Sequence, residues 1–313
     1  MSYNNLSEPF PRQIWNITTL HELHLRDASL NGIIPSTIEN LSNLQWLELS
    51  SNQLNGPIPS TIGNLSNLII LSLSSNKLNG PIPSTIGNLT NLITLSLSSN
   101  KLNGELPSSI CNLTSLDVLL LSNNSLEGTI PQCFQNFQSL LIFHLNANHF
   151  SGLIPSIFIK GCSLISINLS GNKLQGSLPK SLINCKSLKG LDVGNNRILD
   201  KFPFWMEALP QLRVLVLKSN KFDGNMSLPS QSYLSFPKLQ VLDISRNASG
   251  GSLPQRYFKN FKAMMDVKAN YEDMNFVAHV EMTMTLSYII LEAELLFYFT
   301  VRNRDEDFFF SSQ

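Results

Sequence analysis

The stretches LQWLELSSNQLNGPIPSTIGNLSN (residues 44–67) and LIILSLSSNKLNGPIPSTIGNLTN (residues 68–91) are consecutive and nearly identical. They share the pattern LxxLxLxxNxLxGxIPxxIxNLxx. Units of this kind open with a leucine every 24 residues, at positions 20, 44, 68, 92, 116, 140, 164, 188 and 212. A tenth unit opens at Leu239, 27 residues later, with the insertion within Ser227–Pro237. A fixed period of this length is typical of stacked repeats, in which each unit packs only against its neighbours.

The residue types that recur in each unit predict the course of one coil. In LxxLxL, alternate leucines point to the same side of a short strand, where they would fill the interior. The glycine permits a tight backbone path. The proline fixes φ and blocks a regular helix, which disfavours the alternative of an amphipathic helical repeat. We therefore expect an α/β fold, a curved right-handed leucine-rich-repeat solenoid with a parallel sheet on its concave face. Its buried leucine column would include Leu47, Leu71, Leu95 and Leu119.

One asparagine follows each strand motif, and we expect its amide to turn inward. An amide both donates and accepts, so it can satisfy backbone groups that the turn leaves unpaired. The column comprises Asn52, Asn76, Asn100, Asn124, Asn148, Asn172, Asn196, Asn220 and Asn247. Asn247 also heads an Asn-x-Ser sequon, and its inward amide predicts that it carries no glycan. Asn168 should be poorly occupied as well, because it would face the sheet surface between packed neighbours.

The register divides the chain into a partial repeat (1–19), ten repeats (20–254) and a non-repeat tail (255–313). Met1 falls where a strand leucine belongs, without a polar capping segment, so we expect a fragment or a truncated gene product. Both ends would then expose the apolar cross-section of a coil. Because large apolar patches drive association, we expect the chain alone to be marginally soluble, with the tail covering one end.

Charge and hydropathy exclude some classes of function. Lys+Arg and Asp+Glu are both 22, so the formal net charge is zero, which argues against a nucleic-acid partner. Residues Met1–Pro11 do not read as a secretory signal. The apolar run Leu286–Val301 contains Glu292 and Glu294 and is shorter than a membrane span. We expect no membrane span in this chain.

No catalytic constellation emerges from the sequence. His21 and His24 occupy non-leucine strand positions, where a surface location is expected, and His144 shares the column of His24 five repeats away. The recurring glycines are turn glycines, and no GxxxxGK[ST] phosphate loop occurs. We therefore expect a protein that is not an enzyme and needs no cofactor or metal.

The four cysteines are spaced to bridge neighbouring coils. Cys111 and Cys133 are 22 residues apart, and Cys162 and Cys185 are 23 apart, close to the period of one coil. Of the three possible pairings, only this one joins neighbours throughout. A zinc site would require tighter clusters. The remaining alternative is four reduced, partly buried thiols.

Ten Asn-x-Ser/Thr sequons suggest a glycosylated extracellular protein. Five of them begin at one position of the repeat, namely Asn16, Asn40, Asn64, Asn88 and Asn112, and we expect these to carry glycans. The others begin at Asn5, Asn123, Asn168, Asn225 and Asn247. The alternative is that the repeated NLS and NLT triplets are structural and only resemble sequons.

The LxGxIP form of the repeat resembles the plant extracellular subclass of leucine-rich repeats. Residues Ser109–Gly224 resemble plant receptor-like proteins of the disease-resistance and development type, as in LDVGNNRILDKFPFWMEALPQLRVLVLKSNKFDG and KGCSLISINLSGNKLQGSLPKSLINCKSL. GSLPQRYFKNFKAMM resembles the start of the non-repeat island of such receptors. The resemblance implies part of an extracellular ligand-binding array at the plasma membrane, signalling through partner receptor kinases. At both ends the chain departs from that pattern.

Two other readings of function remain open beside the receptor ectodomain, which would recognise a peptide, protein or glycan. One is a soluble binder or decoy, similar in repeat type to plant polygalacturonase inhibitors. The other is a non-functional truncated product. The island-like segment favours the receptor, whereas the lack of a membrane helix favours the other two.

Ligand contacts should cluster at the outward strand positions, which lie 1, 2, 4, 6 and 7 residues after each opening leucine. The middle coils offer mostly Ser and Ile there, which makes them the least favoured site. The last three coils are favoured, with Lys189, Asp192, Arg213, Lys218, Asp243 and Arg246. The first coils, with His24, Trp46 and Glu48, are the secondary candidate. The alternative is that these charges are only a solvated sheet surface.

Overall fold

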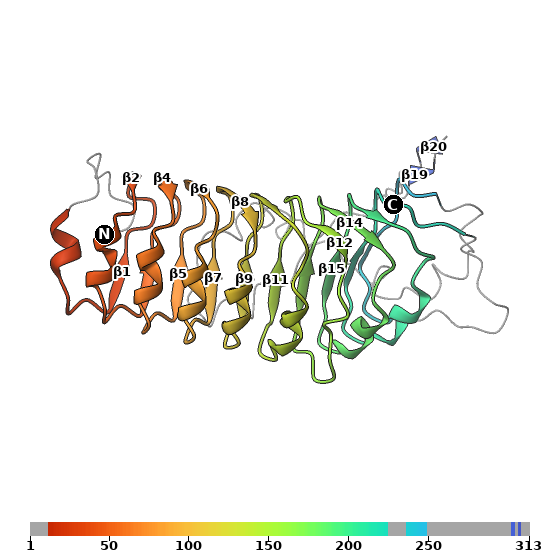
Figure 1. The fold of residues 1–313 in the computed structure, drawn as a ribbon. Coiled ribbons are helices and arrows are strands. Elements are labelled where there is room, and N and C mark those ends of the chain that lie inside the picture. The colour runs from red at the N-terminus through yellow and green to blue at the C-terminus, as the bar shows by residue number, and fades with distance from the viewer. Residues whose placement is uncertain (1–11, 225–235, 249–301, 304–305, 308–313) are drawn as a thin grey trace, which may run out of the picture.

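The computed structural model describes residues 12–224, 236–248, 302–303 and 306–307. Residues 12–224 and 236–248 wind into a stack of coils (Figure 1), and the coils contribute one short strand each to a ten-stranded parallel sheet. In sheet order the strands are β1 (Glu22–His24), β3 (Trp46–Glu48), β5 (Ile70–Ser72), β7 (Thr94–Ser96), β9 (Val118–Leu120), β11 (Ile142–His144), β13 (Ser166–Asn168), β15 (Gly190–Asp192), β17 (Val214–Val216) and β18 (Val241–Asp243).

A second set of strands runs along the flank of the stack. Five form one parallel sheet: β2 (Asn31–Ile33), β4 (Gln53–Pro57), β6 (Lys77–Gly80), β8 (Lys101–Glu105) and β10 (Ser125–Glu127). Three form another: β12 (Ser151–Leu153), β14 (Lys173–Gly176) and β16 (Arg197–Ile198). Between β10 and β12 the ladder is reduced to the isolated bridge from Thr129 to Ser151.

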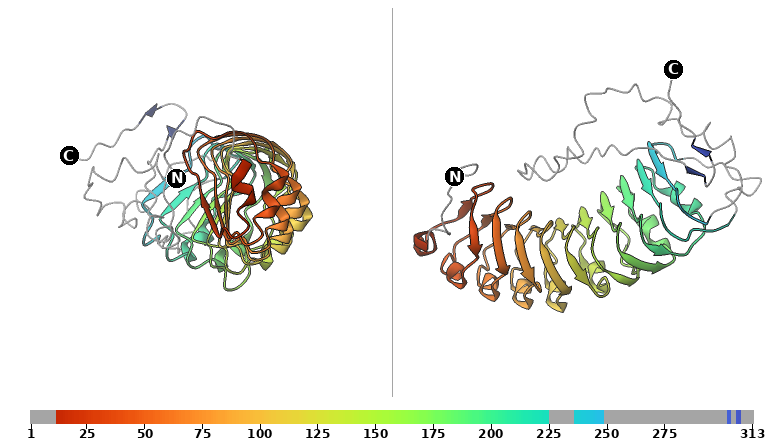
Figure 2. Two further views of the ribbon diagram at one scale, coloured as in Figure 1. Left: turned by 90° about the vertical axis from the view of Figure 1, so that its left-hand side faces the viewer. Right: turned by 90° about the horizontal axis from the view of Figure 1, so that it is seen from above.

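The helical part of the fold consists of 3-10 turns, and the described residues contain no α-helix. The turns are η1 (Arg12–Asn16), η2 (Ser36–Asn40), η3 (Ser60–Asn64), η4 (Ser84–Asn88), η5 (Ser108–Asn112), η6 (Gln132–Asn136), η7 (Lys180–Asn184) and η8 (Phe204–Ala208). The repeat proline precedes the turn in extended conformation, as at Pro59 with φ −66° and ψ 140°. Figure 2 shows the stack as an arc with these turns along its outer side.

The predicted leucine column is confirmed. Leu47, Leu71, Leu95 and Leu119 are each 0% exposed. They pair in register from β3 to β9, each with the next. Burial of one leucine side chain contributes roughly 2 kcal/mol, so stability here comes from stacking rather than from any single coil. The predicted solenoid with a parallel sheet is therefore the observed fold.

The asparagine column turns inward, as expected. Asn100 Nδ2 donates to the carbonyl oxygens of Leu73 and Leu97 at 3.0 and 3.1 Å, and its Oδ1 accepts from Leu78 N at 3.0 Å. The other members repeat this arrangement. Asn247 does so as well, bonding Leu217 O and Ile244 O at 3.0 Å each. Absence of a glycan on Asn247 stays a prediction.

The stack is irregular at the joint between the coil that contains η6 and the coil that follows. The segment 155–163 of the second coil lacks the 3-10 turn that its neighbours have. A small cavity of about 20 Å³ opens here, with Phe134, Phe137, Phe143 and Phe158 in its lining. The same joint also contains the break between β10 and β12 in the flanking sheets. We call this joint the seam.

The predicted division into three segments is not tested by the structure. Of the tail 255–313, the structure describes only β19 (Arg302–Asn303) and β20 (Glu306–Asp307), which pair antiparallel. The rest of the tail and the first eleven residues lie outside the described residues. The expectations that the tail covers one end and that the chain is marginally soluble therefore stay predictions.

Candidate binding surface

The six favoured residues of the last coils separate into distinct groups. Lys189 and Arg213 precede β15 and β17 and lie side by side, because Arg213 N donates to Lys189 O at 2.8 Å. Asp192 and Asp243 lie at the other ends of their strands. Arg246 is exposed and has φ 53°, so it belongs to the turn that follows β18. The predicted residues share one end of the array but do not form a single cluster.

The two acids of this group are largely engaged within the fold. Asp243 is 5% exposed and its Oδ1 accepts from the N–H and the hydroxyl of Ser245, while Lys218 Nζ lies 3.8 Å from its Oδ2. Asp192 Oδ1 accepts from Gly194 N at 2.8 Å. Burial raises the pKa of Asp192, partly offset by that hydrogen bond and by Lys218. These contacts hold the strand ends in shape and leave less charge for a ligand than the sequence suggests.

The secondary candidate at the first coils is a compact group. The rings of His24 and Trp46 are 4.6 Å apart at an interplanar angle of 59°. His24 Nε2 lies 3.1 Å from Glu22 Oε2. Glu48 Oε1 accepts from the N–H and the hydroxyl of Ser50. This end offers one half-buried aromatic surface and a carboxylate that is already hydrogen-bonded.

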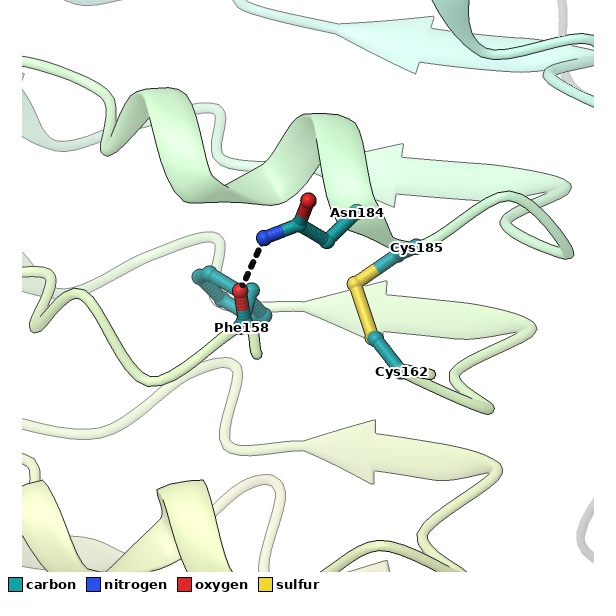
Figure 3. The surroundings of a disulfide bond; sticks show 4 residues. All are labelled: Phe158, Cys162, Asn184 and Cys185. Atoms are coloured by element: carbon teal, nitrogen blue, oxygen red, sulfur yellow. Dashed lines mark hydrogen bonds between the residues drawn. A yellow bond between two sulfur atoms is a disulfide. The ribbon is translucent and has the colours of Figure 1, made fainter. Parts of the chain in front are cut away.

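Both predicted disulfides are present. Cys111 and Cys133 are bonded with Cα atoms 5.6 Å apart, and Cys162 and Cys185 with Cα atoms 4.7 Å apart. Beside the second bridge, Asn184 Nδ2 donates to Phe158 O at 2.8 Å (Figure 3). Each bridge staples two neighbouring coils, on either side of the seam and not across it.

The five aligned sequons lie on the outer side of the arc. Asn16, Asn40, Asn64, Asn88 and Asn112 each end a 3-10 turn and are exposed. The leucine inside each of the last four sequons is fully buried. Asn64 Nδ2 donates to Glu39 Oε2 at 2.6 Å. The leucine is thus the structural residue of the triplet, and the asparagine is accessible. Glycan occupancy stays a prediction, and Asn5 and Asn225 lie outside the described residues.

The described residues offer no cluster of three or more His, Cys, Asp or Glu able to hold a metal ion. His144, on β11, has its Nε2 2.8 Å from Ser166 Oγ, and burial lowers its pKa to about 4. It is therefore a neutral, hydrogen-bonded residue of the sheet. Within the same residues, no helix is long and apolar enough to cross a membrane.

A feature of the concave face that the sequence reasoning passed over is a row formed by the residue after each opening leucine. Its backbone forms a continuous ladder of N–H···O bonds of 2.7–2.9 Å that link neighbouring coils. Its members in the middle coils are Ile69, Ile93, Asp117, Leu141 and Ile165, followed by Lys189. We call these six residues the central row. All six are half-buried, which leaves part of each side chain accessible.

Comparison with known proteins agrees with this architecture. A family model described as "Leucine-rich repeat region" matches residues 3–103, and models described as "Leucine rich repeat" match 115–137 and 162–222. "Receptor like protein 27" and "Receptor like protein 22" of Arabidopsis thaliana are 55% identical over 64 residues and 59% over 63. Each match covers 20% of this chain and only 8% of the relative's length.

Three solved structures illustrate the range of proteins that share the fold. The plant peptide hormone receptor RGFR1 in complex with RGF2 is 30% identical, covers 82% of this chain and 44% of its own, and has a TM-score of 0.71. The Arabidopsis receptor kinase HAESA in complex with the peptide hormone IDA and the co-receptor SERK1 is 30% identical, and the match covers 79% of this chain and 49% of HAESA with a TM-score of 0.60. A plant ice-binding protein is 35% identical, and the match covers 75% of this chain and 74% of the ice-binding protein with a TM-score of 0.66.

The coils, the asparagine ladder and the family models define the class: this chain is a leucine-rich-repeat protein. Within that class, the chain is similar in sequence to plant receptor-like proteins and in structure to plant receptor ectodomains.

Proposed function

We propose that this chain is a ligand-recognition part of the ectodomain of a plant cell-surface receptor-like protein, acting in defence or developmental signalling. It acts by binding and not by catalysis. The observation that carries the proposal is the concave sheet, which presents rows of outward side chains across ten strands. Solved structures of the same fold include receptors bound to peptide hormones. A peptide is therefore the favoured ligand, ahead of a larger protein or a glycan.

The location and partners that we propose follow from the same relatives. The chain would lie on the extracellular face of the plasma membrane, where both disulfides would persist. Signalling would require a partner receptor kinase, in line with the co-receptor in the HAESA complex. Within the array, we place the principal contacts in the last three coils, around Lys189, Arg213 and Lys218, with His24, Trp46 and Glu48 as the secondary site.

The alternative function is that of a soluble binder or decoy, similar to polygalacturonase inhibitors. The ice-binding protein supports this class in part, because 74% of its chain is matched and it is a plant protein of this fold named for binding ice. Inhibition of a fungal polygalacturonase by the purified chain would favour the decoy over the receptor. A truncated product without function would bind neither a peptide nor the enzyme.

The experiment uses the full chain, secreted with its disulfides and glycans, to select binders from a random dodecapeptide phage library. The leading peptide is then measured against two double variants. Arg213→Glu with Lys218→Glu should weaken binding by on the order of tenfold or more, whereas Trp46→Ala with Glu48→Ala should change it little. The opposite result would move the site to the first coils, and failure to enrich any peptide would count against peptide recognition altogether.

A further inference from the structure

The central row combines an apolar surface with two charges that the fold leaves unpaired. Within the described residues, neither the Asp117 carboxylate nor the Lys189 ammonium makes a hydrogen bond or salt bridge. Asp117 stands between Ile93 and Leu141, and burial raises its pKa. A carboxylate among isoleucines and leucines is unfavourable for folding, because it loses hydration without gaining a partner. A cation supplied from outside would offset that cost.

The spacing within the row is set by the sheet. Backbone hydrogen bonds link the six members of the row in order from Ile69 to Lys189. Among them, Asp117 N donates to Ile93 O at 2.9 Å, and Lys189 N donates to Ile165 O at 2.8 Å. Successive members therefore lie at the spacing of neighbouring strands, about 4.8 Å. Asp117 and Lys189 are three steps apart, at about 14 Å. An extended chain covers that distance in about four residues.

The residue that follows each row member along the strand is apolar in two adjacent middle coils. Val118 and Ile142, which begin β9 and β11, are 3% and 8% exposed. In the neighbouring coils the same position holds Thr94 and Ser166, which are buried but polar. A side chain that enters between Leu141 and Ile165, or between Ile69 and Ile93, would therefore meet hydrocarbon mainly from the row residues themselves. In an extended ligand every second side chain faces the same way, about 6.6 Å apart. If one such side chain lies at Asp117, the next on either side falls between Leu141 and Ile165 or between Ile69 and Ile93.

From these contacts we propose that the middle of the concave face binds an extended peptide segment that carries a basic residue and an acidic residue four positions apart, with apolar side chains between and beyond them. The basic residue pairs with Asp117 and the acidic residue with Lys189. The intervening apolar side chain packs on Leu141 and Ile165. This proposal rests on the proposed peptide recognition and adds the chemistry of the ligand. It also moves contacts into the coils that the sequence favoured least.

The same dodecapeptide selection tests the proposal. Peptides enriched on the wild-type chain should share a basic and an acidic residue at a spacing of four, with an apolar residue midway. For the leading peptide, Asp117→Asn and Asp117→Lys should weaken binding by on the order of tenfold and a hundredfold. The matched control is Glu127→Lys, because Glu127 is an exposed acid on β10 in the flanking sheet. It should leave the dissociation constant unchanged.

A charge swap separates specific pairing from a general field effect. A peptide synthesised with its basic and acidic residues exchanged should bind Asp117→Lys/Lys189→Asp better than the wild-type chain. Melting curves of each variant show whether it is folded, and the isosteric Asp117→Asn serves if the reversal is not. Enriched peptides without this charge spacing, or equal affinity for Asp117→Lys and wild type, would overturn the inference. If such peptides depended on Arg213 and Lys218 alone, peptide recognition would stand and the central-row proposal would fall.

Discussion

At the scale of single residues, the asparagine ladder does the work that hydrogen bonds within regular secondary structure do elsewhere. Each coil turns sharply after a three-residue strand, and the turn residue before the asparagine takes positive φ, as at Ser51, Ser75 and Ser99. Carbonyls on the inner side of this turn have no strand partner. The amide of the ladder asparagine meets them, so the turn can be buried in the stack without unpaired groups.

Replacing one ladder asparagine should therefore be costly. Asn100→Ala removes hydrogen bonds to Leu73 O, Leu97 O and Leu78 N. We expect the free energy of unfolding to fall by about 3 kcal/mol, since buried groups lose their partners. The control is Asn67→Ala, which removes one exposed bond to Ser42 O and should cost well under 1 kcal/mol. Urea unfolding followed by circular dichroism measures both, and equal losses would contradict a special role for the ladder.

Gly63 is required by close packing between η3 and η4. A Cβ added there would lie 2.3 Å from the backbone oxygen of Thr85, and backbone cannot move aside as a side chain can. Gly63→Ala should lower the free energy of unfolding by about 1–3 kcal/mol through overpacking. Glu39 occupies the equivalent position of η2 and already has a Cβ, so Glu39→Ala should lose only the exposed hydrogen bond from Asn64, at well under 1 kcal/mol. A neutral Gly63→Ala would show that the turns can separate without cost.

His144 predicts a dependence of stability on pH. Its pKa is lowered by burial from 6.5 to about 4, so the folded chain resists protonation that the unfolded chain accepts. The contribution is therefore fully retained above pH 6.5 and is lost as the pH falls toward 4, by about 3 kcal/mol at most. His144→Gln should remove this part of the pH dependence. Unfolding free energies across that range, compared between variant and wild type, provide the measurement, and identical slopes would contradict it.

Residue positions in the stack could be predicted from the sequence, but the partners of the charged side chains could not. The ladder, the leucine column and the disulfides follow from a fixed period, because residues 24 apart must stack. The state of the charges does not follow from it. Asp243 accepts hydrogen bonds from Ser245 and lies 3.8 Å from Lys218, whereas the carboxylate of Asp117 has no partner among the described residues. The difference depends on where each acid lies relative to its three-residue strand, because Asp243 ends β18 and Asp117 immediately precedes β9. The sequence pattern assigns both to outward positions and cannot rank them.

At the scale of elements, the second disulfide compensates for a missing turn. The segment 155–163 has no 3-10 turn, although Pro155 keeps the repeat register. Its attachments to the next coil include the Cys162–Cys185 bridge and the bond from Asn184 to Phe158 O. The two coils joined by the first bridge each retain their 3-10 turn, η5 in one and η6 in the other. The two bridges are thus alike in spacing and unlike in what they hold.

Removing each bridge should reveal that difference. By closing a loop with a sequence separation of 23, the second bridge is worth about 3 kcal/mol of chain entropy. The first, with a separation of 22, is worth the same. In Cys162→Ser/Cys185→Ser we expect the amides of 157–164 to lose protection from hydrogen exchange. In Cys111→Ser/Cys133→Ser, amides of η5 and η6 should stay protected. Equal local deprotection in the two variants would contradict this assignment.

At the scale of the whole molecule, the seam divides the array into two regular stacks. On one side five flanking strands pair without interruption, and on the other three do. Across the seam, the main sheet and the Asn148 ladder bonds continue, but the flanking ladder is reduced to the isolated bridge from Thr129 to Ser151 and the stack of turns is interrupted. Because neighbouring contacts supply nearly all the stability of such an array, we expect the seam to open before the joints of the five-stranded flanking sheet.

Hydrogen exchange at increasing urea should locate that opening. The amides of His149 and Ser151, which donate across the seam at 2.7 and 2.8 Å, should exchange at lower urea than the amide of Gln53, which makes the corresponding 2.7 Å bond to Leu30 O. A substitution that fills the cavity at the seam should reduce the difference between the urea concentrations at which the seam amides and the Gln53 amide exchange. Exchange of all three amides in one step would indicate that the array opens as a unit, without a weak joint.

The near identity of residues 44–67 and 68–91 has a consequence for how the chain reaches its fold. A coil that begins at Leu44 presents almost the same surfaces as one that begins at Leu68, so either can dock on the coil that begins at Leu92. A growing stack can therefore omit one unit and expel it as a loop, which loses the burial of that unit but leaves a well-matched joint that is slow to correct. The stretch from Cys111 to Cys185 has no such duplicates. Correct alignment during folding should therefore spread from that unique, cross-linked half toward the repetitive one.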